Sequence, residues 1–532
     1  MLFLDQLTAY GRFAFGLRRF LQEPATADLG TQVIGQRLRD RDSHFLTLIK
    51  RAVYENERSP YLELLRLAGC DYDDLERMVR SDGIESTLTR LCDAGVYVTI
   101  DEFKGRQPIV RGGKTVCCRP GDFNNPFLIR SIANSSSGSV GGATTTTMNL
   151  DRLHYYALCT SLAFSAHRLV GKPTVLWMPI LPSAAGLTSL LQLCQMGATP
   201  LRWFSPVAAG AIKPSVSRRL GTEYVVKAGR LFGTRVPSPE FVSGSHVHVV
   251  AECLTGARDG GSGCVVYTSP SAAVKVCQYV KSGGSDLSGV VFVVAGEPLT
   301  AAKSDEIRSA GARAVNLYAF AEGGIVGFGC AGRTSASDDI HVLSSSTAVI
   351  QHGRVTPFDG GTVDAFLFTS LLDKAAKILL NVESGDYGVL ETRDCNCEFG
   401  GLGLTQHLHT IRSFDKLTGA GMTFVGTDLV RIVEEVLPGR FGGSSTDYQM
   451  VESEDAGGRT WLDIVASPEV GRIQEQEIVR LVLSELERGN DTNRMMAEVW
   501  RQGGMLRLRR ERPHVTRAGK LFPLHISKDG RS

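Results

Sequence analysis

Residues 290–300 read Val-Val-Phe-Val-Val-Ala-Gly-Glu-Pro-Leu-Thr, an apolar run that opens into a glycine-containing loop. A continuous run of β-branched and aromatic residues is typical of a strand that is buried on both faces. Open α/β sheets bind their ligands where such strands end in glycine-rich loops. We therefore expect residues 290–294 to form a buried strand and residues 295–300 to reach a ligand site. An ordinary strand-to-turn junction is the alternative.

Similar apolar runs alternate with helix-like stretches on both sides of this segment. Alternation of this kind predicts an α/β fold built from layered sheets and helices. The apolar runs are 175–178, 247–251, 265–267 and 315–318, and the helix-like stretches are 151–170 and 304–310.

The pattern changes near both ends of the chain. Residues 1–100 carry helical periodicity, which predicts a helical N-terminal extension packed on a large domain over residues 101–411. Residues 412–532 read as a small α+β domain. Its expected strands are 423–425 and 461–465, and its expected helices are 427–436 and 474–487.

Composition narrows the class of protein. The chain has 532 residues with 58 Lys+Arg against 56 Asp+Glu, so nothing in its charge demands a nucleic-acid partner. No apolar run approaches the ~18–20 residues that a membrane helix needs, and residues 1–20 resemble an amphipathic helix without a cleavage site. The 12 cysteines then read as reduced thiols, which predicts a soluble, cytoplasmic protein.

Residues 134–147 read Asn-Ser-Ser-Ser-Gly-Ser-Val-Gly-Gly-Ala-Thr-Thr-Thr-Thr, a cluster of hydroxyl and glycine residues. Such a segment can present several N–H and O–H donors to phosphate oxygens. It lacks the Lys-Ser/Thr ending of a Walker A loop, which disfavours a P-loop NTPase. A flexible linker is the alternative.

Charged residues follow further turns. Glu322 ends a segment, residues 316–322, that follows a strand-like run and precedes a Gly-Gly pair, and a carboxylate there could hold Mg²⁺ beside phosphate. Asp386 is expected in a tight turn at 384–388, for which an Asx turn is the alternative. Arg412 and Lys520 lie in the later segments 411–416 and 516–520.

Taken in order, these motifs resemble those of the adenylate-forming superfamily of acyl-CoA synthetases, adenylation domains and luciferases, and most nearly its phenylacetate-CoA ligase branch. The resemblance runs from about residue 60 to residue 525. The segments that carry it are 136–141 (Ser-Ser-Gly-Ser-Val-Gly), 296–300 (Gly-Glu-Pro-Leu-Thr), 318–322 (Tyr-Ala-Phe-Ala-Glu), 385–386 (Gly-Asp), 395–397 (Cys-Asn-Cys) and 516–520 (Thr-Arg-Ala-Gly-Lys).

The resemblance implies an ATP-dependent reaction. A substrate carboxylate would attack the α-phosphorus of MgATP, expel pyrophosphate and form an acyl-adenylate, and the thiol of coenzyme A would then accept the acyl group. The resemblance assigns binding roles to the matching residues. Phosphate would be bound by Ser136, Ser137, Gly138, Ser139 and Gly141, and Mg²⁺ by Glu322. Ribose would be bound by Asp386 and Arg412, and adenine by Tyr318, Asn316 and the backbone of Gly296 and Glu297.

The resemblance also implies a mobile small domain. Phe414 or Asp415 would form its hinge, and Lys520 would be the catalytic lysine that it delivers to the carboxylate and ATP oxygens. Rotation about the hinge would withdraw Lys520 and present another face for thiolysis.

Three positions depart from the superfamily pattern. Ala321 stands where a phosphate-contacting Thr is usual, Gly142 where a phosphate-loop Lys is common, and Ala319 where a Gly follows the Tyr. Losing one or two phosphate donors costs ~2–4 kcal/mol of transition-state stabilisation unless another group, such as Thr144 or Thr145, substitutes. A non-catalytic nucleotide-binding protein is therefore one alternative. Transfer to a carrier-protein phosphopantetheine or to an amine is the other, and a homodimer stays open.

The acid pocket is expected to be moderately apolar. The superfamily usually lines this pocket from segments near the phosphate motifs, and the residues that fit here are Trp177, Met178, Pro179, Trp203, Phe204 and Phe320.

A second metal is a separate hypothesis. Cys395, Cys397, His407 and His409 offer four ligands, the number that a structural Zn²⁺ site needs. The two histidines alternate along an expected strand, so both would point the same way. The spacing is not that of a standard zinc finger, and packed or solvated side chains are the alternative.

Overall fold

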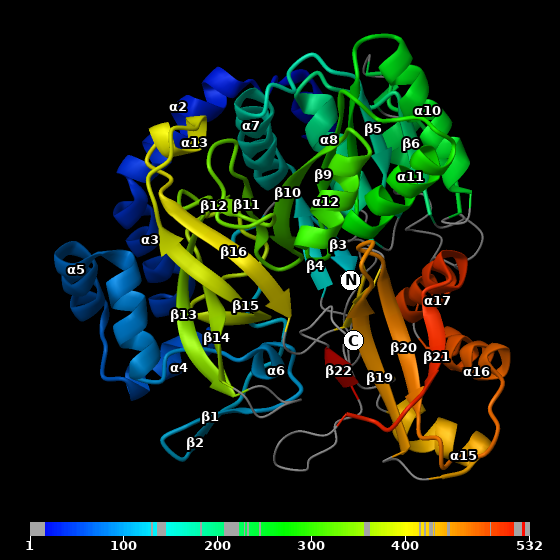
Figure 1. Cartoon of the computed structure of the whole chain (residues 1–532). Coiled ribbons are helices and arrows are strands. Elements are labelled where there is room, and N and C mark those ends of the chain that lie inside the picture. Colours follow the sequence, from blue (N-terminus) through cyan, green and yellow to red (C-terminus); the bar gives the residue numbers. More distant parts are fainter. Residues whose placement is uncertain are drawn as a thin grey trace.

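The computed structural model describes residues 16–128, 131–135, 145–180, 183–206, 223–227, 229–230, 234–243, 246–355, 362–413, 417–419, 422–424, 429, 431–443, 447–489, 491–514 and 524–526. The apolar run 290–294 forms strand β9 (Val290–Val294) near the centre of a 12-stranded sheet and is followed by helix α12 (Ala301–Ser309). Figure 1 shows this large sheet with helices around it and a smaller unit, coloured orange to red, beside it. Within the described residues, no helix is both long and apolar enough to cross a bilayer.

One half of the sheet is parallel. Strands β7, β6, β5, β8, β9 and β10 lie side by side in that order and run the same way. Their bounds are β5 Thr174–Trp177, β6 Arg202–Ser205, β7 Pro239–Phe241, β8 Cys264–Thr268 and β10 Arg313–Phe320.

Helices cover both faces of this half, which explains why β9 has no polar residue. Val291 and Val293 belong to the apolar core on one face, under α7 (Leu150–Ala166) and α8 (Ala185–Gln195). Val290, Phe292 and Val294 belong to the core on the other face, under α12, α10 (Val247–Asp259) and α11 (Pro270–Ser282). Alternate side chains of a strand point to opposite faces, so each face of β9 needs apolar residues.

The prediction of a strand at 247–251 is wrong, because these residues form the start of α10. Val247, Val250, Ala251 and Leu254 are its buried residues, a spacing of three or four that places them on one side of a helix. A short apolar run does not distinguish a buried strand from a buried helix, and here the helix extends to Asp259.

The other half of the sheet is antiparallel and begins where β10 turns back into β11 (Gly324–Gly329). Five further strands follow in the order β12, β16, β15, β14 and β13. Their bounds are β12 Ile340–Val342, β13 Thr347–Val355, β14 Thr362–Ser370, β15 Val382–Thr392 and β16 Gln406–Ser413, with the short helix α13 (Glu398–Gly401) between β15 and β16.

The N-terminal segments are helical and share one apolar core with the antiparallel strands. Phe45, Leu64 and Leu88 from the helices pack there with Val349 and Phe368 from the sheet. The helices are α2 Ala27–Arg39, α3 Arg41–Ile49, the π-helical turn Lys50–Tyr54, α4 Pro60–Leu67, α5 Tyr72–Asp93 and α6 Ile100–Phe103. Two hairpins follow, β1–β2 (Ile109–Arg111, Lys114–Val116) and β3–β4 (Ser131–Ser135, Thr145–Asn149).

The smaller unit has its own apolar core, which draws on residues from Leu429 to Leu524 and includes the fully buried Trp500. Its four-stranded sheet has the order β21-β20-β19-β22. The strands are β19 Tyr448–Glu454, β20 Thr460–Ala466, β21 Leu506–Arg510 and β22 Leu524–Ile526, and the helices are a π-helical turn Ile432–Val436, α15 Leu437–Phe441, α16 Glu475–Glu487 and α17 Asp491–Gly503. A small hairpin, β17–β18 (Leu417–Gly419, Met422–Phe424), precedes them.

Candidate active site

A cavity of about 450 Å³ lies at the carboxyl ends of β5, β8, β9 and β10. The loops that leave β9 and β10 form part of its wall, as the carboxyl ends of parallel strands do in open α/β sheets. Three residues of the smaller unit, Val499, Gln502 and Gly503, also line it. The cavity therefore lies between the two units.

Seven of the predicted nucleotide and metal residues line this one cavity. They are Gly296, Glu297, Asn316, Tyr318, Glu322, Asp386 and Arg412. The predicted phosphate loop (Ser136, Ser137, Gly138, Ser139 and Gly141), the hinge (Phe414 and Asp415) and Lys520 lie outside the described residues.

Tyr318 and Asp386 are directly bonded. The Tyr318 hydroxyl donates to Asp386 Oδ2 at 2.7 Å, and the Ser413 hydroxyl donates to Asp386 Oδ1 at 2.5 Å. Burial and the Asp386 charge raise the pKa of Tyr318 well above its ordinary value, so the phenol keeps the proton that it donates. Two hydroxyl donors thus fix the position of the Asp386 carboxylate in the wall of the cavity.

Asp338, which the sequence did not single out, organises the same wall. Its carboxylate accepts bonds from the backbone N–H groups of Thr410 and Ile411 at 2.8 and 2.9 Å, and from the Arg412 guanidinium at 2.9 Å. Its backbone carbonyl accepts a bond from the Asn316 amide at 2.9 Å. Thr410 has a φ of 54°, a left-handed conformation that costs a non-glycine residue free energy, and the Asp338 bond helps to hold it.

Glu322 is buried and forms an ion pair with Lys104, another residue that the sequence did not single out. A second lysine, Lys377, lies close enough for the Glu322 charge to act on it. Burial lowers the pKa of Lys377 to about 8, the Glu322 charge opposes that shift and the Lys104 charge reinforces it. The predicted metal-binding carboxylate therefore lies in cationic surroundings.

Glu297 connects the cavity to the smaller unit. Its carboxylate accepts bonds from the backbone N–H and hydroxyl of Ser271 at 2.8 and 2.7 Å, and from Lys303 Nζ at 3.3 Å. Lys303 Nζ also lies 3.4 Å from a carboxylate oxygen of Glu454 at the end of β19. Thr300 donates to the other oxygen of Glu454 at 2.5 Å. The loop after β9 thus serves both the cavity and the joint between the units.

The turn between β19 and β20 fits closely against this loop. A Cβ added to Gly458 would lie 2.8 Å from the Lys303 backbone, so only glycine allows this approach. Gly296, at the cavity, has a φ of 90° and also requires glycine.

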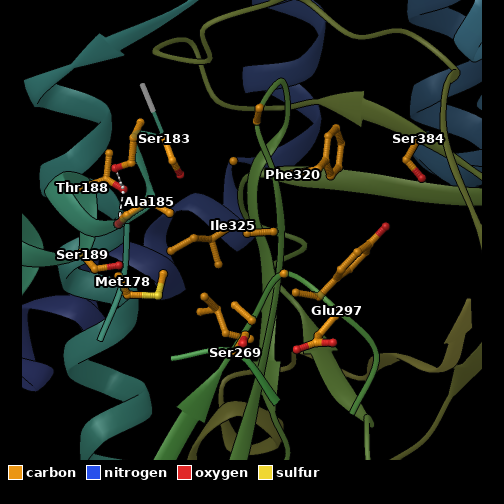
Figure 2. A pocket seen from close by; sticks show the side chains of 18 of the residues that line it. Met178, Ser183, Ala185, Thr188, Ser189, Ser269, Glu297, Phe320, Ile325 and Ser384 are labelled. Carbon is orange, nitrogen blue, oxygen red and sulfur yellow. Dashed lines mark hydrogen bonds between the residues drawn. The ribbon is translucent and has the colours of Figure 1, made fainter. Parts of the chain in front are cut away.

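Four of the predicted acid-pocket residues, Trp177, Met178, Pro179 and Phe320, line the cavity. The other two predictions are wrong, because Trp203 and Phe204 are fully buried in the cores on the two faces of the sheet. Figure 2 shows Met178, Ser183, Thr188 and Ser189 on one side of the cavity and Glu297, Phe320 and Ser384 on the other, with Ile325 between them. The pocket wall is thus apolar with several hydroxyl groups.

The predicted zinc ligands do not converge as a set. Cys395 and Cys397 lie together, but His407 Nδ1 lies 2.8 Å from Asp339 and 2.9 Å from Arg393. His409 Nδ1 lies 3.0 Å from the Thr410 hydroxyl. The cysteines instead meet Cys330 and His341, which the strand pairing brings from another part of the chain.

No protein-family model matches the chain, and no curated protein matches it in sequence. Among solved structures, it is similar to 2-hydroxyisobutyryl-CoA ligase in complex with 2-HIB-AMP and CoA in the thioesterification state, at 15% identity over 92% of this chain and 91% of that chain, with a TM-score of 0.55. An open conformation of that ligase scores 0.45 at 14% identity, covering 94% of this chain and 92% of that chain. An amide bond synthetase from Marinactinospora thermotolerans scores 0.40 at 13% identity, covering 90% and 92%.

The first of these similarities extends over both units of the chain. At 15% identity it establishes a shared fold, and it confirms the prediction of an α/β architecture in which a large N-terminal part is followed by a small C-terminal one.

Proposed function

We propose that the chain activates a carboxylic acid with ATP to an acyl-adenylate and then transfers the acyl group to the thiol of coenzyme A. The observation that carries this proposal is the convergence of Tyr318, Asp386, Asn316 and Arg412 on one cavity at the carboxyl ends of parallel strands. These residues resemble those of adenylate-forming enzymes by motif, and they come from three strands, β10, β15 and β16.

The ribose and adenine would occupy the wall that Asp338 organises. Asp386 already accepts bonds from two hydroxyl groups, and the vicinal hydroxyls of a ribose are donors of the same chemistry. Asp338 fixes the nearby Arg412 and Asn316, so little side-chain entropy would be lost when a nucleotide binds there.

Glu322 fits a Mg²⁺ ion that arrives with ATP. Magnesium in phosphate sites is typically held by one or two carboxylates together with substrate oxygens and water, and Glu322 supplies one carboxylate at the cavity. When bound, the ion neutralises charge on the phosphates. Lys104 is the protein's own cation at this carboxylate, and we propose that it gives way to the metal or turns toward the phosphates.

Lys520 would complete the adenylation site, and residues 412–532 would form the mobile small domain that delivers it about a hinge at Phe414 or Asp415. The chemical difficulty is that a carboxylate must approach a polyanion. A lysine that bridges the two lowers that barrier by stabilising the charge that develops between them.

Ala321 gives specific support to a second candidate, a nucleotide-binding protein without adenylation activity. It lines the cavity beside Glu322 but offers no hydroxyl to a phosphate. The acyl acceptor also has alternatives, because a carrier-protein thiol or an amine could replace coenzyme A in the second half-reaction.

The deciding experiment measures pyrophosphate–ATP exchange with a panel of carboxylic acids, which are tested in three groups: aliphatic, aromatic and hydroxylated. We expect exchange with at least one acid, and a loss of about 100-fold or more in Lys520→Ala. Lys374→Ala, at a half-exposed lysine that pairs with Asp373, is the control. Measurable ATP binding with no exchange for any acid would favour the binding protein. Mass analysis of the product formed with coenzyme A, a carrier protein or an amine then identifies the acceptor.

A further inference from the structure

Four metal-ligating side chains converge about the start of β12 and the loop after β15. They are Cys330, His341, Cys395 and Cys397, and their ligand atoms all lie within 4.8 Å of one another. The sulfurs of Cys395 and Cys397 are 3.1 Å apart, and they lie 3.2 and 3.1 Å from His341 Nε2. Cys330 Sγ lies 3.8 Å from Cys395 Sγ.

These separations are close to those of a tetrahedral zinc site. With Zn–S bonds of about 2.3 Å and a Zn–N bond of about 2.0–2.1 Å, ligand atoms lie about 3.5–3.8 Å apart. The four separations given above lie within about 0.7 Å of these values, and all six are below 4.8 Å. A set of three thiolates and one imidazole nitrogen selects Zn²⁺ over the harder cations Mg²⁺ and Ca²⁺.

The surroundings orient the four ligands. His341 Nδ1 lies 2.7 Å from the Leu404 carbonyl and donates its proton there, which leaves the Nε2 lone pair directed at the sulfurs. The Gly332 N–H donates to Cys330 Sγ at 3.4 Å. The Phe399 ring covers the His341 ring at a centroid distance of 5.5 Å.

Glycine is also required beside the cluster. A Cβ on Gly400 would lie 2.2 Å from the Cys395 carbonyl oxygen and 2.9 Å from its sulfur. The loop that carries Cys395 and Cys397 therefore folds tightly enough for both sulfurs to face the same position.

We propose that Cys330, His341, Cys395 and Cys397 bind one structural Zn²⁺ ion. All four tetrahedral positions come from protein, so the ion has no open position for a substrate. Binding displaces the thiol protons of the three cysteines into solvent, and no oxidant or reductant is involved.

The ion would anchor the segment that carries Asp338. Cys330 and His341 lie on either side of this segment, and the two cysteines after β15 would fix both of its ends to a second loop. Asp338 in turn accepts the bonds from Thr410, Ile411 and Arg412. The zinc would thus position the cavity wall from a distance.

The test uses the full chain, produced without a polyhistidine tag, with metal measured by mass spectrometry after gel filtration. We expect one zinc per chain in the wild type and less than a tenth of that in the Cys395→Ser/Cys397→Ser double variant. Cys117→Ser and His409→Gln are the controls that should keep the metal. A wild type without zinc, a double variant that retains it, or loss of zinc in His409→Gln would overturn the proposal.

Two measurements on the wild type do not depend on variants that fold. Zinc-edge X-ray absorption should give three sulfur and one nitrogen neighbours, and a shell of nitrogen and oxygen alone would contradict the site. Hydrogen exchange should show the Thr410 and Ile411 amides exchanging at least 10-fold faster after chelation and recovering when Zn²⁺ is restored. Unchanged exchange would refute the anchoring of Asp338.

Discussion

Asp386 and Asp338 are both buried carboxylates at the cavity, and they differ in the donors that hold them. Asp338 accepts two backbone N–H bonds and a guanidinium, which belong to the framework of β16. Asp386 accepts from the hydroxyls of Tyr318 and Ser413, which can rotate away. Asp386 is therefore the carboxylate that can exchange a protein donor for a ligand hydroxyl.

We predict that Asp386→Asn weakens ATP binding about 10- to 100-fold. The amide removes the charge that strengthens bonds from ligand hydroxyls, and hydrogen bonds to charged groups contribute about 1.5–3 kcal/mol. Titration calorimetry with ATP measures the loss, and Asp364→Asn, on an exposed part of β14, is the matched control. Equal affinity in the two variants would contradict the role of Asp386.

The residues that the sequence located in the cavity share one property. Gly296, Asn316, Tyr318 and Asp386 belong to recognisable short motifs, so the sequence indicates both the residue type and its position. The local structure was harder to predict, because Asp386 lies within β15 and not in the expected tight turn. Lys104, Asp338 and Lys303 have no such motif. Their roles depend on partners that are distant in the sequence. Asp338 and its partner Arg412 are 74 positions apart, and Lys104 and its partner Glu322 are 218 positions apart. No local sequence pattern encodes such a pairing.

At the scale of elements, β11 and β12 lie just beyond β10, where the sheet changes from parallel to antiparallel pairing, and they pack closely. A Cβ on Gly327 would lie 2.0 Å from the His341 carbonyl oxygen. The close approach keeps β12 in register with β11, and through His341 it also sets the position of the cysteine cluster.

We predict that Gly327→Ala lowers the free energy of unfolding by about 1–3 kcal/mol, because the added methyl must displace backbone in a packed core. Gly353→Ala in β13 is the control, since a Cβ there meets only the Thr362 methyl at 3.8 Å. Urea unfolding followed by circular dichroism compares the two. Similar midpoints for both variants would show that the strands can separate at no cost.

Whether an element could be predicted depended on its length and its pattern. The run 290–294 is apolar throughout and became β9, and the helix expected at 474–487 became α16. The run 247–251 was too short to reveal its period. The pairing of β12 with β16, which brings His341 beside the loop of Cys395, joins strands distant in the sequence, so the sequence indicated the wrong histidines.

At the scale of the whole molecule, Lys275 lies where the units meet. Its Nζ donates to the Gly503 carbonyl at 3.3 Å. Burial, helped by the Arg459 charge and opposed by the Glu297 charge, lowers the pKa of Lys275 to about 8. Both Gly503 and Arg459 belong to the smaller unit, so part of this shift exists only while the units are docked.

We predict that docking becomes more favourable as the pH rises from about 8 toward 10.5, the ordinary pKa of lysine. Below this window Lys275 is protonated in both arrangements, and within it only the docked lysine loses its proton, so raising the pH favours docking by at most about 3 kcal/mol. Small-angle scattering at pH 7.5 and 9.5 measures the change in radius of gyration. In Lys275→Met the response should vanish, and an identical response in wild type and variant would assign it to other groups.

The charges of Glu297, Lys303 and Glu454 affect the free-energy cost of separating the two units. Lys303 is 2% exposed and is balanced by Glu297 within the large unit, whereas Glu454 is already 22% exposed and would carry its charge into water. Separation therefore strands no unpaired ion inside either half, which is the usual reason that breaking a buried salt bridge is costly. If the small domain moves as proposed, the two units would separate without leaving a buried charge unpaired, and the close approach of Gly458 to Lys303 would define their docked position.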